Sequence, residues 1–172
     1  MNANGYCVVT VDGTRARFFS LEPVEHPELE SGPNLVEGTL DLVSTEPDIP
    51  GKEMWTDPKT GRHQAPGGGP AHGYDDHRDE HVDEYKRRFA RQVAQQALRW
   101  AQSRQAKVLV IAAEPKMLGM VREALQVPPH EGIEVREMPK DVSKLSPLQI
   151  HERLAEAGLL PPRRKVNPGA PR

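Results

Sequence analysis

The stretch Lys107–Pro115, KVLVIAAEP, joins a continuous apolar run to a proline. An apolar run of strand length without polar alternation is typical of a central strand that is buried on both faces of a sheet. Proline is favoured at the start of a helix, because its missing N–H would have no intrahelical partner there. The stretch therefore predicts a buried strand over Lys107–Ala113, followed by a helix that begins at Pro115.

Strand and helix patterns continue toward the C-terminus. Ile133–Met138 alternates between apolar and polar residues, as a short strand does. Ser146 and Pro147 predict the start of a final helix, which runs through Leu154 and which Gly158 can end. Such alternation of strand and helix is typical of parallel β-α-β units.

Three strands are predicted nearer the N-terminus, at Tyr6–Val11, Ala16–Leu21 and Leu35–Val43. Asp12–Thr14 is typical of a hairpin turn between the first two strands, because glycine tolerates the positive φ of a tight turn. A long amphipathic helix is expected later, where apolar residues recur at three- and four-residue spacing. Its apolar face consists of Val82, Tyr85, Phe89, Val93, Ala97 and Trp100.

The order of elements predicts one α/β domain over residues 1–160. It contains a mixed β-sheet, with antiparallel strands first and β-α-β units after them, flanked by helices. A loop of about residues 44–77 separates the third strand from the long helix. Residues 161–172 are proline-rich and basic without any acidic residue, and are expected to form a disordered tail.

The composition narrows the functional class. The apolar run Tyr6–Val11 lacks the basic start and the length of a signal peptide or a membrane span, so we expect a cytoplasmic protein with no membrane contact. Cys7 is the only cysteine and lies inside this run, so a buried structural role is expected for it. We also expect no cofactor.

The long loop is the first candidate functional segment. It is rich in proline and glycine and lacks apolar periodicity, and loops of this length are usually functional or disordered. We expect about residues 51–74 to be mobile in the isolated protein. Pro66–Pro70 is not followed by a lysine with serine or threonine, so the sequence gives no support for a phosphate-binding loop.

Two further patterns follow the loop. His77, Glu80 and His81 match the H-x-x-E-H arrangement, in which two imidazoles hold zinc and the glutamate acts as a general base. Glu84 is the nearest candidate for a third ligand. The alternative interpretation is that these residues only form the solvated, polar first turns of the helix. Further along the helix, a basic and amide face suits a phosphate backbone, or is simply the solvated side of the helix. That face consists of Arg88, Arg91, Gln95, Arg99 and Gln102.

Several stretches together resemble the bacterial host-attachment protein family, over about residues 6–157. They are Val8–Phe19, Phe89–Ala94, Val108–Gly119 and Lys140–Leu145. That family is similar to the middle domain of archaeo-eukaryotic class 1 peptide release factors, which implies a mixed sheet between helices. Release factors carry Gly-Gly-Gln in the glycine loop, whereas this chain has Gly67-Gly68-Gly69-Pro70, with Gln64 before the glycines. The catalytic glutamine therefore has no counterpart here.

The resemblance implies a non-enzymatic, translation-associated factor that binds ribosomal or transfer RNA. The candidate contacts lie in the loop, on the helix face and in the tail, and are Arg62, Gln64, Gly67, Gly68, Gly69, Arg88, Arg91, Arg99, Arg163, Arg164 and Lys165. A protein-interaction or host-attachment factor is the first alternative. A zinc-dependent hydrolase that uses His77, His81 and Glu84 is the second.

Overall fold

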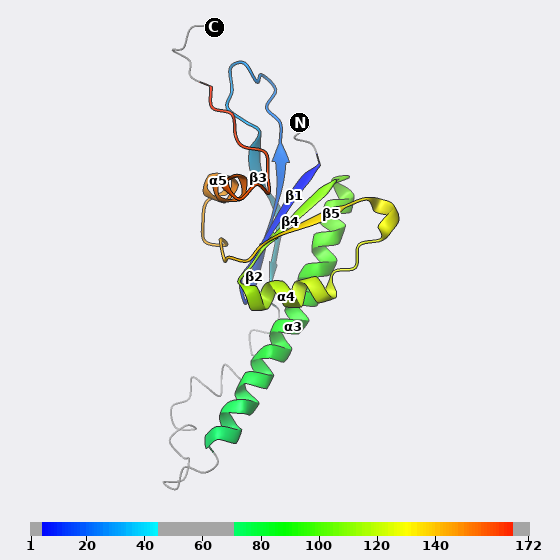
Figure 1. Cartoon of the computed structure of the whole chain (residues 1–172), viewed down its shortest axis with the longest axis vertical. Helices are drawn as coiled ribbons and strands as arrows, with labels where there is room; N and C mark the ends of the chain where they lie inside the picture. The colour runs from blue at the N-terminus through cyan, green and yellow to red at the C-terminus, as the bar shows by residue number, and fades with distance from the viewer. Residues whose placement is uncertain (1–4, 45–70, 167–172) are drawn as a thin grey trace.

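The computed structural model describes residues 5–44 and 71–166, with the side chains of the long helix described from Glu80 onward. In this part of the chain, five strands form one sheet and three α-helices pack against it (Figure 1). The strands are β1 (Tyr6–Val11), β2 (Arg15–Glu22), β3 (Asn34–Val43), β4 (Val108–Ala112) and β5 (Glu134–Met138). The helices are α3 (Ala71–Ser103), α4 (Pro115–Ala124) and α5 (Pro147–Glu156), with a short 3₁₀ helix η1 (Pro129–Glu131) before β5.

The sheet is mixed, which confirms the predicted α/β class. Its strand order is β3-β2-β1-β4-β5, in which β1, β2 and β3 pair antiparallel while β1, β4 and β5 pair parallel. All five residues of β4 are buried, as predicted for a strand that is covered on both faces. The central position belongs to β1, however, because β1 pairs with β2 on one side and with β4 on the other.

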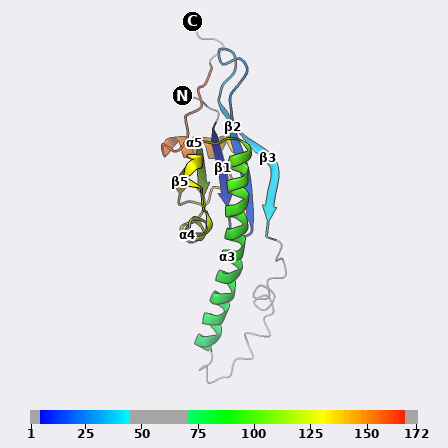
Figure 2. The same ribbon diagram turned by 90° about the vertical axis from the view of Figure 1, so that its right-hand side faces the viewer.

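The helices cover both faces of the sheet (Figure 2). Helices α3 and α4 pack on one face, where the buried side chains of alternate strand residues meet Phe89, Val93 and Met117. Helix α5 packs on the opposite face, where Ile150 and Leu154 meet the remaining strand residues. Alternation along each strand therefore supplies two separate apolar layers.

Helix α3 begins at Ala71, six residues before the predicted loop end at His77. The prediction used the apolar repeat, which begins only at Val82 and so cannot locate a helix start upstream of it. The members of that repeat nearest the middle of the sheet, including Phe89 and Ala97, are fully buried. The N-terminal part of α3 extends beyond the sheet (Figure 1).

The hairpin between β1 and β2 turns by a different mechanism from the one predicted. Gly13 does not have a positive φ. Instead, Asp12 Oδ1 accepts hydrogen bonds from the backbone N–H groups of Thr14 and Arg15, both at 2.7 Å. Aspartate commonly stabilises turns in this way, because its short carboxylate can accept hydrogen bonds from the backbone two residues ahead.

Residues 161–166, which we call the C-terminal segment, pack beside the loop between β2 and β3. Arg164 and Gly32 exchange two backbone hydrogen bonds of 2.9 and 3.0 Å. Arg163 Nε donates to Asn34 Oδ1 at 2.7 Å. Residues 161–166 therefore contact the domain, and the disordered tail over residues 161–172 stays a prediction. Composition gives no signal for these contacts, because backbone hydrogen bonds require no apolar pattern.

Among the described residues, no helix combines the length and the apolar character that crossing a bilayer requires.

Candidate nucleic-acid interface

The solvent side of α3 carries the basic and amide residues that the sequence singled out. Arg88, Arg91, Gln95, Arg99 and Gln102 are all exposed, and their three- and four-residue spacing places them along one side of the helix. We call these five residues the α3 stripe. They are exposed because the opposite side of the same helix buries its apolar residues against the sheet.

The charge of the α3 stripe is positive along most of its length, since the sequence has no acidic residue between Glu84 and Glu114. Glu84, at the start of the stripe, lies 3.4 Å from Arg88 and 3.8 Å from Arg91. These pairs are about half exposed, so each adds little stability, but the Glu84 carboxylate offsets one positive charge at this end of the stripe. The remaining part of the α3 stripe has arginine and glutamine alone.

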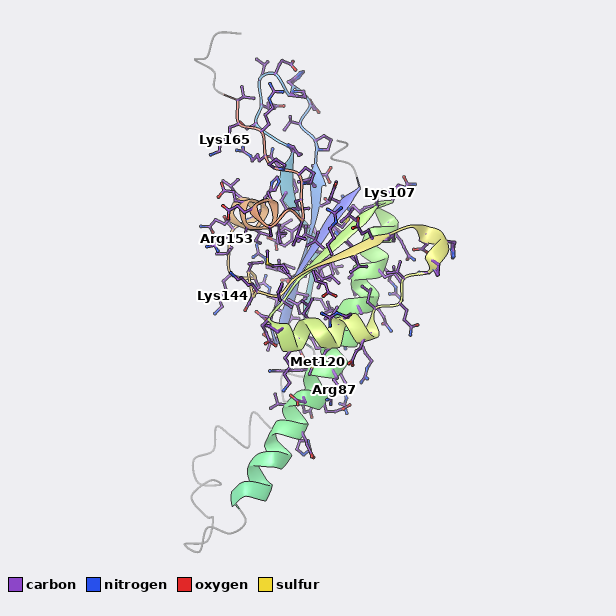
Figure 3. The ribbon with its side chains drawn as sticks, in the orientation of Figure 1. Arg87, Lys107, Met120, Lys144, Arg153 and Lys165 are labelled. Atoms are coloured by element: carbon purple, nitrogen blue, oxygen red, sulfur yellow. The ribbon has the colours of Figure 1, made fainter. Side chains whose placement is uncertain are left out.

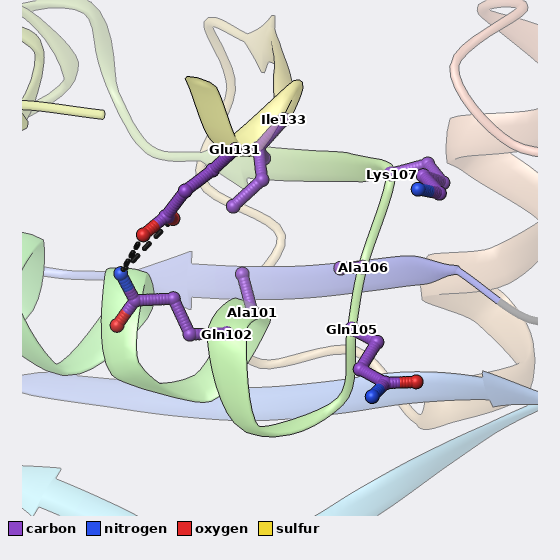
Figure 4. A pocket seen from close by; sticks show the side chains of 7 residues that line it. All are labelled: Ala101, Gln102, Gln105, Ala106, Lys107, Glu131 and Ile133. Atoms are coloured by element: carbon purple, nitrogen blue, oxygen red, sulfur yellow. Dashed lines mark hydrogen bonds between the residues drawn. The ribbon is translucent and has the colours of Figure 1, made fainter. Parts of the chain in front are cut away.

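A pocket of about 450 Å³ lies at the C-terminal end of the α3 stripe (Figure 4). The α3 end, the connection to β4 and the segment before β5 line this pocket with Ala101, Gln102, Gln105, Ala106, Lys107, Glu131 and Ile133. Gln102 Nε2 donates to both carboxylate oxygens of Glu131, at 2.7 and 3.0 Å. Because Gln102 belongs to both features, this Gln102 pocket continues the α3 stripe.

The end of α3 gives the pocket its shape. Ala106 N–H donates to Ala101 O at 2.8 Å and Gln105 N–H donates to Gln102 O at 3.1 Å, the pair of bonds that closes a helix in a Schellman motif. Gln105 has a φ of 52°, a left-handed conformation in which glycine is usual. The connection then turns sharply, and Lys107 N–H donates to Gly5 O at 2.7 Å.

A second polar cavity, of about 480 Å³, lies beside the β1–β2 turn. Arg17 lines it and donates to both carboxylate oxygens of Glu37, at 3.0 and 2.8 Å, and to the backbone oxygens of Ser143 and Leu145. The hydrogen bonds from Arg17 lower the pKa of Glu37. Arg17 therefore ties β2, β3 and the segment before α5 together, and its guanidinium is already used in the fold.

The basic residues of the C-terminal segment lie apart from the α3 stripe. Figure 3 places Lys165 at the end of the molecule opposite Arg87, on the side of the sheet that α5 covers. Arg163 is partly buried and bonded to Asn34, whereas Arg164 and Lys165 are exposed. The structure thus does not bring the helix and tail candidates into one surface.

The predicted zinc ligands are only partly described. His81 is exposed on α3, and the carboxylate of Glu84 is taken by Arg88 and Arg91. The side chain of His77 lies outside the described residues. Within the described part of the chain, no three His, Cys, Asp or Glu side chains lie close enough to hold a metal ion.

Other sequence predictions have separate outcomes. Cys7 is buried as predicted, and burial raises the pKa of its thiol to about 12. The loop candidates lie outside the described residues, namely Arg62, Gln64, Gly67, Gly68 and Gly69. The contact of Glu131 with Gln102, by contrast, was not predicted from the sequence. Glu131 is 29 positions from Gln102, and only the short Pro128-Pro129 break hinted at structure before β5.

The comparison with curated proteins gives no match. Residues 7–154 match the model of the family described as "Protein required for attachment to host cells". The match runs from β1 through most of α5, so it includes the sheet, the α3 stripe and the Gln102 pocket. Most of the chain is matched, and the protein therefore belongs to this host-attachment family.

Proposed function

We propose that this protein is a non-enzymatic, translation-associated factor that binds ribosomal or transfer RNA through the α3 stripe. One observation carries the proposal: the exposed side of α3 presents arginine and glutamine side chains, while the sequence from residue 85 to residue 113 has no acid. Arginines arranged along a helix neutralise phosphates and release counterions, which supplies most of the affinity of nonspecific nucleic-acid binding.

RNA is favoured over other polyanions by two arguments. The chain resembles the middle domain of peptide release factors in the order of its elements, which by analogy suggests a ribosomal location. The α3 stripe also combines cations with amides, and amide side chains can both donate hydrogen bonds to sugars and base edges and accept them. The Gly/Pro-rich loop and the exposed Arg164 and Lys165 are additional candidate contacts.

The α3 stripe predicts a charge-dependent affinity. Replacing Arg91 and Arg99 by glutamine removes two cations and preserves the length and polarity of the face. The double variant is expected to bind labelled transfer RNA more weakly and to reduce the slope of log affinity against log salt by up to about two, because each lost phosphate contact lowers it by roughly one. Fluorescence anisotropy at several salt concentrations measures both quantities.

A matched control removes the same charge from the other side of the sheet. Lys144 and Arg153 are exposed there, and Figure 3 shows both near α5. The K144Q/R153Q variant should keep the affinity and most of the salt slope of the unchanged protein. Equal affinities for the two double variants would contradict the proposal.

In lysate, the unchanged protein should sediment with ribosomal particles in a sucrose gradient at low salt, and R91Q/R99Q should not.

A protein-interaction role in attachment to host cells is the second candidate. The family description favours this role. So do the exposed apolar side chains Val36 and Val43 on β3, which is an edge strand of the sheet. Such a role predicts a protein partner that remains bound after ribonuclease treatment and is indifferent to R91Q/R99Q. It also predicts that V36T/V43T weakens that complex, because an apolar contact surface is lost.

A further inference from the structure

The Gln102 pocket lies where an RNA strand that follows the α3 stripe would arrive. Arg99 is one turn of helix before Gln102, and Lys107 is exposed at the far side of the pocket. Proteins that read single-stranded RNA splay unstacked bases out and form hydrogen bonds with the base edges. A volume of about 450 Å³ is within the usual range of small-ligand sites and exceeds what one base needs.

The lining suits a planar ring with a polar edge. Ala101, Ala106 and Ile133 provide apolar surface for the faces of the ring. Glu131 and Gln102 converge at one end of the pocket, as Figure 4 shows, where the Glu131 carboxylate offers the acceptors that the Gln102 amide occupies in the structure. Their side chains come from two segments far apart in the sequence, so the polar end is fixed by the fold and not by one flexible loop.

Glu131 restricts the base that fits. A carboxylate only accepts hydrogen bonds, and in the structure both of its oxygens face the donor nitrogen of Gln102. Guanine offers two adjacent donors on its Watson–Crick edge, N1–H and the N2 amino group. Adenine, cytosine and uracil each offer one donor group there. A guanine edge can therefore replace the single amide of Gln102 with two hydrogen bonds to the same carboxylate.

We infer that the Gln102 pocket binds the guanine base of an unpaired nucleotide, with Glu131 accepting from N1–H and N2. This inference rests on the proposed function, because the α3 stripe brings the strand to the pocket. An arginine side chain of a peptide also offers two adjacent donors to a carboxylate. The positive α3 stripe repels cationic peptides and attracts the RNA backbone, which favours the guanine.

The inference predicts selectivity among RNAs of equal charge. The probes are fluorescein-labelled oligomers of eight uridines, in which one central uridine is kept or replaced by guanosine, adenosine or cytidine. The guanosine oligomer is expected to bind about tenfold more tightly than the others, as a two-bond base contact commonly provides. Anisotropy titration at one fixed salt concentration compares the four dissociation constants.

Two variants assign the selectivity to the pocket. E131Q should bring the guanosine oligomer to the affinity of the adenosine oligomer, because an amide group places a donor against the guanine edge. E156Q removes an exposed carboxylate from the end of α5 on the opposite face and should keep the tenfold preference. Q102A should also keep it, because the base replaces the amide. Circular dichroism establishes that each variant is folded.

The outcomes separate this inference from the proposed function. Equal affinity for all four oligomers, with R91Q/R99Q still weakening them all, would overturn the guanine pocket and leave RNA binding in place. Absence of binding to every oligomer and to transfer RNA would overturn both. Glu131-dependent binding of N-acetyl-arginine amide without a guanosine preference would assign the pocket to a peptide and overturn the inference.

Discussion

At the scale of single residues, Trp100 and Gly38 determine how α3 sits on the sheet. The indole N–H of Trp100 donates to Phe19 O at 2.8 Å, at the point where the pairing of β2 with β3 is irregular. The ring lies against Gly38, where an added Cβ would overlap the nearest atom of the Trp100 ring. Arg104 covers the ring at 4.2 Å from its centre. Only a glycine leaves room for this arrangement.

Gly38→Ala is therefore expected to destabilise the protein by about 1–3 kcal/mol, the usual cost of forcing extra atoms into a packed core. Gly119→Ala provides the opposite case. Gly119 lies inside α4 with open space around its Cα, so alanine should stabilise the helix by about 0.5–1 kcal/mol. Urea denaturation measures both changes. A Gly38→Ala protein as stable as the unchanged one would show that Trp100 does not press on β3.

The Arg17–Glu37 pair predicts a pH-dependent stability. The Arg17 side chain is 13% exposed and donates two bonds to Glu37, which lowers the pKa of that carboxyl below its unfolded value. Glu37 therefore contributes stability above its unfolded pKa of about 4.3 and loses it as the pH falls through the folded pKa. Glu37→Gln should cost about 1–2 kcal/mol at pH 7.

Thermal melts between pH 3 and pH 7 check this expectation. The difference between the unchanged protein and Glu37→Gln should shrink below about pH 4, where Glu37 becomes protonated and the pair loses its charge. Glu152→Gln, an exposed position on α5, serves as the control and should follow the unchanged protein closely. A gap that stays constant down to pH 3 would mean that the ion pair is not the source of the stability.

At the scale of elements, local patterns predicted most of the architecture. The final helix α5 illustrates why: Ser146 and Gln149 form a capping box, Pro147 occupies the first turn and Gly158 follows the end with a φ of 76°. Each signal lies within four residues of the boundary that it specifies. Strand β4 and the start of α4 were equally clear, since one nine-residue stretch includes both.

Features that depend on distant contacts were not predictable in the same way. The exposed side of α3 could be read from spacing alone, but the Gln102 pocket requires Glu131 to approach from another segment. The contacts of the C-terminal segment gave no signal because they involve backbone groups and isolated polar side chains, which form no periodic pattern. The turn at Asp12 was located correctly. Its hydrogen bonds, however, are accepted by the Asp12 carboxylate, and composition does not distinguish such a turn from a glycine-dependent one.

At the scale of the whole molecule, the C-terminal segment connects the loop between β2 and β3 to helix α5. It bonds to Gly32 and Asn34 near the start of β3, and Pro161 O lies 2.8 Å from Nε2 of the buried His151 on α5. Val166 N–H also donates to Ser31 Oγ at 2.9 Å. The segment thereby fixes the loop between β2 and β3 to the helical layer that covers one face of the sheet.

Ending the chain after Leu160 should lower the free energy of unfolding by about 2 kcal/mol. Several hydrogen bonds of roughly 1 kcal/mol each are lost, and the released segment regains conformational entropy. Ending the chain after Val166 keeps those bonds and should leave the midpoint of thermal unfolding within about 1 °C of that of the full chain. Differential scanning calorimetry compares the three proteins. Identical midpoints for the two shortened chains would show that the segment is held too weakly to matter.

Because β1 is the central strand, its two neighbours are synthesised at different times. Of the five strands, β1 is translated first. One of its edges pairs with β2, and the partner for the other edge is β4, which begins with the pairing of Tyr6 with Val108. The β1–β2–β3 ribbon therefore leaves the ribosome with an open edge, and such edges readily pair with other chains. A chain that ends before residue 108 keeps that edge of β1 open, whereas one that extends past residue 112 supplies β4 as the neighbour.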